Sequence, residues 1–157
     1  MRNINKYLFL LVLLFPLTGF ASSPAVYTYT VKRSINAVYP DLRKALESEG
    51  YYVILEPNIG KNISRFAEDW GDDYNRNKLD GIRSMVFCNG WYANKVSNAD
   101  PDMLAMCPLH LTLIEKNGKT TALFVRPSVV AKGSPAEKIM KSIETEVTGI
   151  IQESLGM

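Results

Sequence analysis

The stretch from Leu109 to Pro127 restricts the possible folds of this chain more than any other part of it. It reads LHLTLIEKNGKTTALFVRP, in which two runs of β-forming residues flank Asn117-Gly118. This dipeptide suits a type I′ turn, where both central residues have positive φ, so the pattern predicts a β-hairpin. His110 and Thr112 alternate with leucines, so we expect His110 on the face of its strand that the leucines leave free.

A capped amphipathic helix is expected directly after the hairpin. Ser134 suits the cap, Pro135 the first helical position, and Glu137 completes a capping box. The predicted buried face consists of β-branched residues at helical spacing, namely Ile139, Ile143, Val147, Ile150 and Ile151.

Three more strands and two more helices are predicted before the hairpin. The strands are expected over 26–31, over 51–57 as a buried strand, and over 81–88. The first helix ends at Gly50, and Ser34 or Asn36 can cap its start, of which Asn36 is favoured because Pro40 is tolerated only in a first turn. The second helix is expected from Asn62 to Gly71. The order β-α-β-α-β-β-β-α predicts an α+β single domain with helices packed on a mostly antiparallel sheet.

The N-terminus has the three parts of a secretory signal peptide. Two basic residues precede an apolar run over 7–17, and Gly19-Phe20-Ala21 supplies the small residues at a cleavage site. The apolar run of 11 residues is short of the roughly 20 that a transmembrane helix needs. We therefore expect a signal peptide over 1–21 and one soluble domain over 22–157, periplasmic or secreted.

The charge of the mature chain argues against nucleic acid as a partner. Cleavage removes two of the 18 Lys and Arg residues, and the remaining 16 equal the 16 Asp and Glu residues. Nucleic-acid binding requires clustered basic residues that neutralise phosphates. A neutral chain without such a cluster does not fit this class of function.

Cys88 and Cys107 are the two cysteines of the chain. In an oxidising compartment an even pair of cysteines favours a disulfide. This bond would close a loop of 18 intervening residues, which is worth about 3 kcal/mol in the chain-entropy model. No C-x-x-C or C-x-x-C-H occurs, so neither a thioredoxin-type active site nor a covalently attached haem is expected.

The segment DPDMLAMCPLH, residues 100–110, raises two alternatives to the structural disulfide. Asp100 and Pro101 are expected to start a short helix. Soft sulfur ligands and imidazole suit copper, so a copper site would use Cys88, Met103, Met106, Cys107 and His110. The other alternative is a redox-active cysteine pair. Methionines at helical spacing also serve as packing residues, and a disulfide would remove both thiolates from metal chemistry.

The leading functional hypothesis is a module that binds an unknown small ligand or protein partner. Its surface is predicted on the polar loop 89–108, with Trp91, Tyr92, Asn94 and Met103. No nucleophile elbow, Walker A motif or dinucleotide fingerprint occurs, so no catalytic residues and no cofactor are predicted apart from the copper alternative.

The patterns LRKALESEGYYVILE and VFCNGWYANKVSNADPDMLAMCPLHLTLIEKNGK resemble the domain of unknown function 302 family. The likeness covers about residues 26–130 and rests on order and spacing, including Phe87, Asn89, Asp100-Pro101 and Pro108-Leu109. It implies a compact α+β domain with homodimer formation as a candidate, and it supplies no catalytic residues. Cys88 stands where the family commonly has glycine, so both cysteines resemble features of a subgroup.

Overall fold

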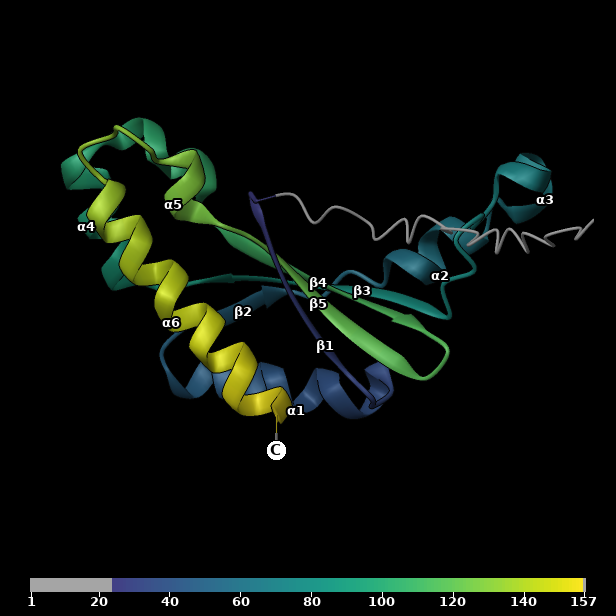
Figure 1. Cartoon of the computed structure of the whole chain (residues 1–157). Coiled ribbons are helices and arrows are strands. Elements are labelled where there is room, and N and C mark those ends of the chain that lie inside the picture. Colours follow the sequence, from purple (N-terminus) through teal and green to yellow (C-terminus); the bar gives the residue numbers. More distant parts are fainter. Residues whose placement is uncertain (1–23, 157) are drawn as a thin grey trace, which may run out of the picture.

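One antiparallel sheet of five strands carries the fold (Figure 1). The structure is a computed structural model that describes residues 24–156, so the predicted signal peptide lies outside the described residues. The strands are β1 (Val26–Val31), β2 (Tyr52–Leu55), β3 (Gly81–Cys88), β4 (Leu109–Lys116) and β5 (Lys119–Val125), in the spatial order β1-β5-β4-β3-β2. The predicted α+β single domain and its order of strands and helices are confirmed.

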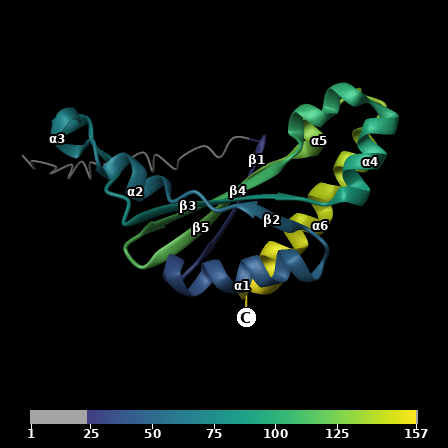
Figure 2. The same cartoon turned by 180° about the vertical axis from the view of Figure 1, so that it is seen from behind.

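Two long helices, α1 (Ile35–Ser48) and α6 (Glu137–Gly156), lie side by side on the same face of the sheet (Figures 1 and 2). The core lies between this helix pair and the sheet. Alternate residues of the central strands point into it, as the period of two in a strand requires. The largest fully buried side chains include Tyr51, Phe87, Phe124, Leu42, Leu46, Met85, Leu111 and Leu113.

The predicted hairpin is confirmed, whereas helix α6 begins at Glu137, three residues after the predicted Ser134 cap, and the predicted capping box does not form. Asn117 and Gly118 have φ of 53° and 67°, the left-handed values that a type I′ turn needs. Ser134 accepts a hydrogen bond from the Ala136 amide at 3.0 Å, and Glu137 accepts one from the Gly133 amide at 2.8 Å. These bonds hold the turn that leads into α6, with Ser134 and Glu137 each accepting from an amide that precedes the helix.

Helix α1 begins earlier than predicted. Ser34, and not Asn36, is its cap, and Pro40 lies inside the helix. The Ile35 amide donates to Glu115 Oε2 at 2.9 Å, and the Ile35 side chain is buried, so tertiary contacts support the two additional residues at the N-terminus of the helix. The Pro40 ring lies on the exposed side of α1.

The segment from β2 to Trp70 differs from prediction in two respects. β2 was expected to be buried but is an edge strand, and its Tyr52, Ile54 and Leu55 side chains are 60–63% exposed. Two short helices, α2 (Ile59–Ser64) and α3 (Ala67–Trp70), replace the single helix expected from Asn62. The true cap is Asn58, whose Oδ1 accepts from the Lys61 amide at 2.9 Å.

The segment 89–108 was predicted to be a loop, yet most of it is helical. Helix α4 (Gly90–Ala99) is capped by Asn89, and the 3₁₀ helix η2 (Pro101–Met106) is capped by Asp100 as expected. The sequence of α4 has no clear apolar period, because Val96 is the one residue of this helix that is fully buried and the other positions need not be apolar. Two further short helices are η1 (Gly71–Asp73) and α5 (Pro127–Val130).

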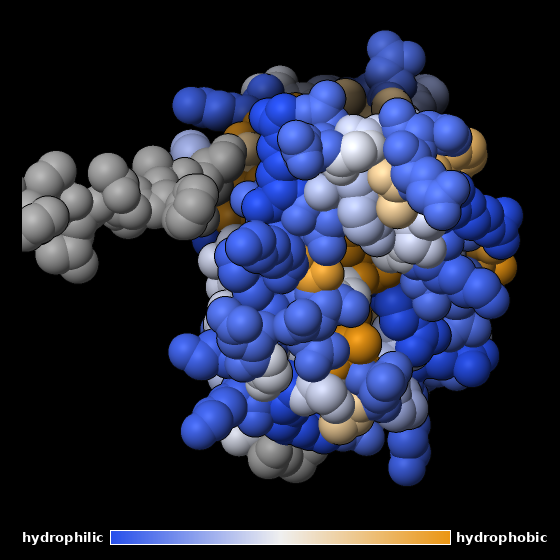
Figure 3. Space-filling model, turned by 90° about the vertical axis from the view of Figure 1, so that its right-hand side faces the viewer, coloured by the Kyte–Doolittle hydropathy of each residue, from blue (hydrophilic) through white to orange (hydrophobic). Residues whose placement is uncertain are grey.

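The surface on the side that carries α2 and α3 is largely hydrophilic, and apolar residues show at the bottom of a central hollow (Figure 3). Among the helices of residues 24–156, none combines the length and apolar character required to cross a bilayer.

Candidate functional site

Cys88 and Cys107 lie next to each other although 18 residues separate them in the sequence. Cys88 ends β3, and Asn89 caps α4 immediately after it. Cys107 ends η2 just before β4, and its amide donates to the Leu104 carbonyl at 2.8 Å. Because β3 and β4 pair through Phe87 and Leu109, the two cysteines reach the same end of the sheet.

The two sulfur atoms are 3.4 Å apart and both cysteines are half-buried free thiols. A disulfide has an S–S distance of about 2.05 Å. The disulfide predicted from the sequence is therefore not present in this structure. The number of cysteines and the expected compartment correctly indicated that Cys88 and Cys107 lie together. They do not determine whether the two thiols are oxidised.

A small cavity adjoins the thiol pair at the junction of the sheet with α4 and α6. Its volume of 20 Å³ holds about one water molecule or one ion. Its walls are mostly apolar and consist of Tyr51, Cys88, Asn89, Tyr92, Ala93, Val96, Met106, Cys107, Leu109, Met140 and Ile143. The cavity is too small for an organic ligand.

The environment of Cys107 favours its neutral thiol. Burial raises the pKa of Cys107 to about 11, and the neighbouring Cys88 acts in the same direction. Both causes penalise a thiolate, because a charge in an apolar site loses solvation and a second sulfur beside it adds no compensation. Cys107 is thus a weak nucleophile at neutral pH.

Tyr51 and Tyr92, which line this cavity, both donate hydrogen bonds to Glu146 of α6. Tyr51 donates to Glu146 Oε2 at 2.9 Å, and Tyr92 donates to Glu146 Oε1. The two rings are stacked with centroids 6.3 Å apart. Burial first, and then the Glu146 hydrogen bond, raise the pKa of Tyr51, whereas the Glu146 hydrogen bond is the main cause that raises the pKa of Tyr92 to about 12.

The residues of the copper alternative do not all lie at this cavity. Met106 lines it together with both cysteines, whereas Met103 packs against the core and is absent from its wall. His110 is exposed and pairs with Val86 on the sheet face opposite Leu109 and Leu111. Among residues 24–156, no three His, Cys, Asp or Glu side chains are grouped so that they could hold a metal ion.

The predicted ligand or partner surface is also divided. Trp91 is 64% exposed, and Lys95 Nζ lies 4.9 Å from the centre of its ring. Asn94 is exposed beside them. Tyr92 and Met103 instead pack against the core. Of the four residues predicted for this surface, Trp91 and Asn94 are therefore exposed on α4.

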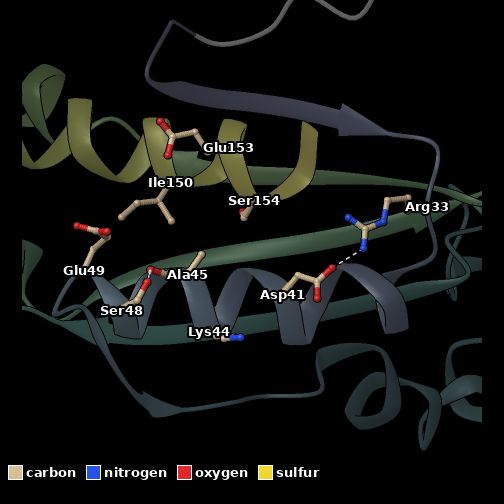
Figure 4. A pocket seen from close by; sticks show the side chains of 9 residues that line it. All are labelled: Arg33, Asp41, Lys44, Ala45, Ser48, Glu49, Ile150, Glu153 and Ser154. Atoms are coloured by element: carbon tan, nitrogen blue, oxygen red, sulfur yellow. Dashed lines mark hydrogen bonds and ion pairs between the residues drawn. The ribbon is translucent and has the colours of Figure 1, made fainter. Parts of the chain in front are cut away.

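A groove between α1 and α6 was not foreseen from the sequence (Figure 4). Its volume is 490 Å³, and Ala45, Ile150 and the buried Ser154 lie along it. The Arg33–Asp41 ion pair lies at one end. The Ser154 hydroxyl donates to the Ile151 carbonyl at 3.4 Å. The charged residues Lys44, Glu49 and Glu153 also line the groove, so it carries groups of both signs. It depends on how the two helices pack, which no local motif encodes.

The family model for the domain of unknown function DUF302 matches residues 27–154. The chain belongs to the DUF302 family. This confirms the resemblance found in the sequence and extends it to include α6. No curated protein matches the chain.

A crystal structure of an uncharacterized conserved DUF302 protein from Bacillus stearothermophilus resembles this chain with a TM-score of 0.71. The identity is 20%, and the match covers 85% of this chain and 99% of that one. The two proteins share the DUF302 fold. Because the DUF302 description names no function, chemistry has to be inferred from the residues of this chain.

Proposed function

We propose that this protein is an exported, redox-responsive domain in which Cys88 and Cys107 interconvert between a dithiol and a disulfide. The observation that carries the proposal is the 3.4 Å contact between their sulfur atoms. Export is supported by the signal-peptide pattern over residues 1–21. An exported protein meets conditions in which neighbouring thiols oxidise.

The reaction is a thiol–disulfide exchange with a small disulfide such as glutathione disulfide. Two S–H bonds of the protein break and one S–S bond forms between Cys88 and Cys107. Two electrons and two protons pass to the glutathione disulfide, which becomes two thiols. The raised pKa of Cys107 makes the exchange slow at neutral pH, so the pair suits a structural response to the environment better than rapid catalysis of exchange.

Oxidation would connect the end of β3 to the end of η2 and thereby close the segment that contains α4. In the dithiol form this segment is held by hydrogen bonds, from Tyr92 to Glu146 and from Ser134 to Asp100. A covalent bond at its two ends reduces the conformational freedom of the unfolded chain. The function we propose is thus a change in the stability of the α4 region with the redox state.

Thermal unfolding of the oxidised and reduced protein tests this proposal. We expect treatment with glutathione disulfide to raise the unfolding temperature by about 10 °C, which corresponds to about 3 kcal/mol for a loop of this length. Cys88→Ser and Cys107→Ser should each unfold at one temperature whatever the redox buffer. Equal unfolding temperatures for the oxidised and reduced wild type, or failure to form the intramolecular disulfide, would contradict the proposal.

Copper binding is a second candidate because three sulfur atoms border one ion-sized cavity. Cys88, Cys107 and Met106 would supply two thiolates and a thioether, a donor set that selects Cu(I). We expect the reduced protein to take up one equivalent of Cu(I) and Met106→Leu to weaken this binding, because leucine lacks the thioether ligand. Met103→Leu is the matched control, because Met103 is absent from the cavity wall. No stoichiometric uptake, or equal effects of both variants, rules out this candidate.

The binding of a partner at the predicted 89–108 surface has weaker support. Trp91 and Asn94 are its exposed members, and neither lines the cavity beside the thiol pair. We therefore place the thiol pair ahead of partner binding as the proposed function.

A further inference from the structure

Arg83 on β3 is a cation without a carboxylate partner. It pairs across the sheet with the buried Leu113 and is itself half-buried. Its guanidinium carbon lies 3.6 Å from the ring centre of Tyr39, so the ring supports one face of the guanidinium. Within residues 24–156, Nε of Arg83 is buried without a hydrogen-bond partner, and no carboxylate oxygen lies within 4.0 Å of the group. Because Nε is closed to solvent, the terminal Nη groups of the half-buried side chain are the donors that a ligand in the adjoining cleft would use.

This side chain lines a cleft of 470 Å³ between the start of α1, helix α2 and the beginning of β3. Gly60 lets α2 approach β3 closely, because an added Cβ would lie 3.2 Å from the Ile82 amide nitrogen. The volume is within the range of about 300–1,000 Å³ that small-molecule sites occupy. The walls combine apolar with polar groups, and they include Ile35, Ile63, Tyr74, Leu79, Asn58 and Lys61.

The carboxylates near Arg83 are already engaged by other groups. Glu115 accepts a hydrogen bond from the Ile35 amide at 2.9 Å, and Asp80 accepts one from the Asn117 amide at 2.7 Å. Glu56 lies near the Tyr39 hydroxyl and pairs with Arg43 at 3.8 Å. Within the described residues, none of these carboxylates forms an ion pair with Arg83.

We propose that the Arg83 cleft binds a small organic carboxylate with an apolar body. The planar guanidinium fork matches a carboxylate in a bidentate arrangement, and the Tyr39 ring holds the plane of the fork. The apolar walls accommodate the rest of the molecule. A monoanion suits the cleft better than phosphate, because its lining holds two carboxylates, Asp80 and Glu115, as well as the two cations Lys61 and Arg83. This site is separate from the thiol pair and does not depend on it.

Hexanoate is a suitable probe, with hexanamide as its uncharged isostere and inorganic phosphate as the tetrahedral oxyanion. The measurement is a titration of the folded domain, residues 22–157, followed by backbone amide chemical shifts. We expect saturable shifts with hexanoate around Lys61, Ile82 and Arg83. Hexanamide and phosphate should bind at least tenfold more weakly.

Variants connect the binding to the cleft. Arg83→Gln should weaken hexanoate binding at least tenfold, whereas Lys141→Gln on the exposed side of α6 should leave it unchanged. Arg83→Gln could fail to fold, so Asn36→Trp provides a second test. Asn36 is exposed at the rim of the cleft, and a tryptophan there should block entry without altering the core.

Four results would overturn the proposal. The first is the absence of saturable shifts with hexanoate up to its solubility limit. The second is equal binding of hexanoate and hexanamide, and the third is tighter binding of phosphate than of hexanoate. The fourth is undiminished hexanoate binding in a folded Arg83→Gln protein or in Asn36→Trp.

Discussion

At the scale of single residues, the chemistry near the thiol pair depends on groups that are kept neutral. Tyr51, Tyr92 and Cys107 all have a raised pKa, and burial or the nearby Glu146 carboxylate is the cause. Neutral phenols donate hydrogen bonds to Glu146 and hold α4 against α6. Ionised phenols would lose these bonds and repel the carboxylate.

The raised pKa of Tyr92 predicts that the protein loses stability in alkaline solution. Below pH 10 the phenol is protonated in both the folded and the unfolded state, so its contribution to stability is constant. Between pH 10 and about 12 the unfolded chain releases this proton while the folded chain retains it. The free energy of unfolding therefore decreases as the pH rises through this range. Urea unfolding at several pH values measures the decrease.

Tyr92→Phe tests the origin of this pH dependence. Phenylalanine removes the titrating hydroxyl, so we expect a smaller loss of stability between pH 10 and 12 than in the wild type. Tyr52→Phe is the matched control, because Tyr52 is 63% exposed on β2. A loss of stability in Tyr92→Phe as steep as in the wild type would disprove this explanation.

At the scale of secondary structure, Ser134 joins two elements. It accepts from the Ala136 amide in the turn before α6 and also donates to Asp100, which caps η2. We predict that Ser134→Ala lowers the free energy of unfolding by about 1–2 kcal/mol, because both hydrogen bonds are lost, and the unfolding temperature by roughly 3–6 °C. Differential scanning calorimetry measures both quantities.

Ser142→Ala is the control for this prediction. Ser142 lies on the exposed side of α6, and its hydroxyl donates only to the Lys138 carbonyl of the same helix. Alanine has the higher helix propensity, so this variant should be neutral or slightly stabilising. Equal losses in Ser134→Ala and Ser142→Ala would show that Ser134 has no special role.

Elements with strong local signals could be predicted from the sequence, and elements that depend on tertiary contacts could not. The Asn117-Gly118 turn is determined by residues within a few positions and was predicted correctly, and the last helix was predicted correctly apart from its start, which lies at Glu137 instead of directly after Ser134. Helix α4 has a weak apolar period, so its sequence predicts a loop instead of a helix. β2 was predicted to be buried because a short apolar run does not distinguish a central strand from an edge strand.

The same distinction applies to the candidate sites. The pairing of Cys88 with Cys107 follows from their number and the predicted compartment, and the structure places them in contact. Their oxidation state could not be read from that pattern. The Arg83 cleft has no sequence signal, because it arises where α1, α2 and β3 meet.

At the scale of the whole molecule, the DUF302 sheet separates two regions of different chemistry. The thiol pair and α4 lie at one end of the sheet, and α2 and the Arg83 cleft lie toward the other end (Figures 1 and 2). Changes of redox state at one end therefore need not alter a carboxylate bound at the other. Homodimer formation stays a prediction, and the exposed apolar side chains of β2 are available to it.

The central claim, an exported domain with an oxidisable thiol pair, is tested most directly by the intact mass of the protein recovered after secretion. We predict the mass of residues 22–157 less two hydrogen atoms, with a gain of two hydrogen atoms after reduction and two alkylated cysteines only then. A secreted protein with both thiols free before reduction, or a chain that retains residues 1–21, would contradict the account.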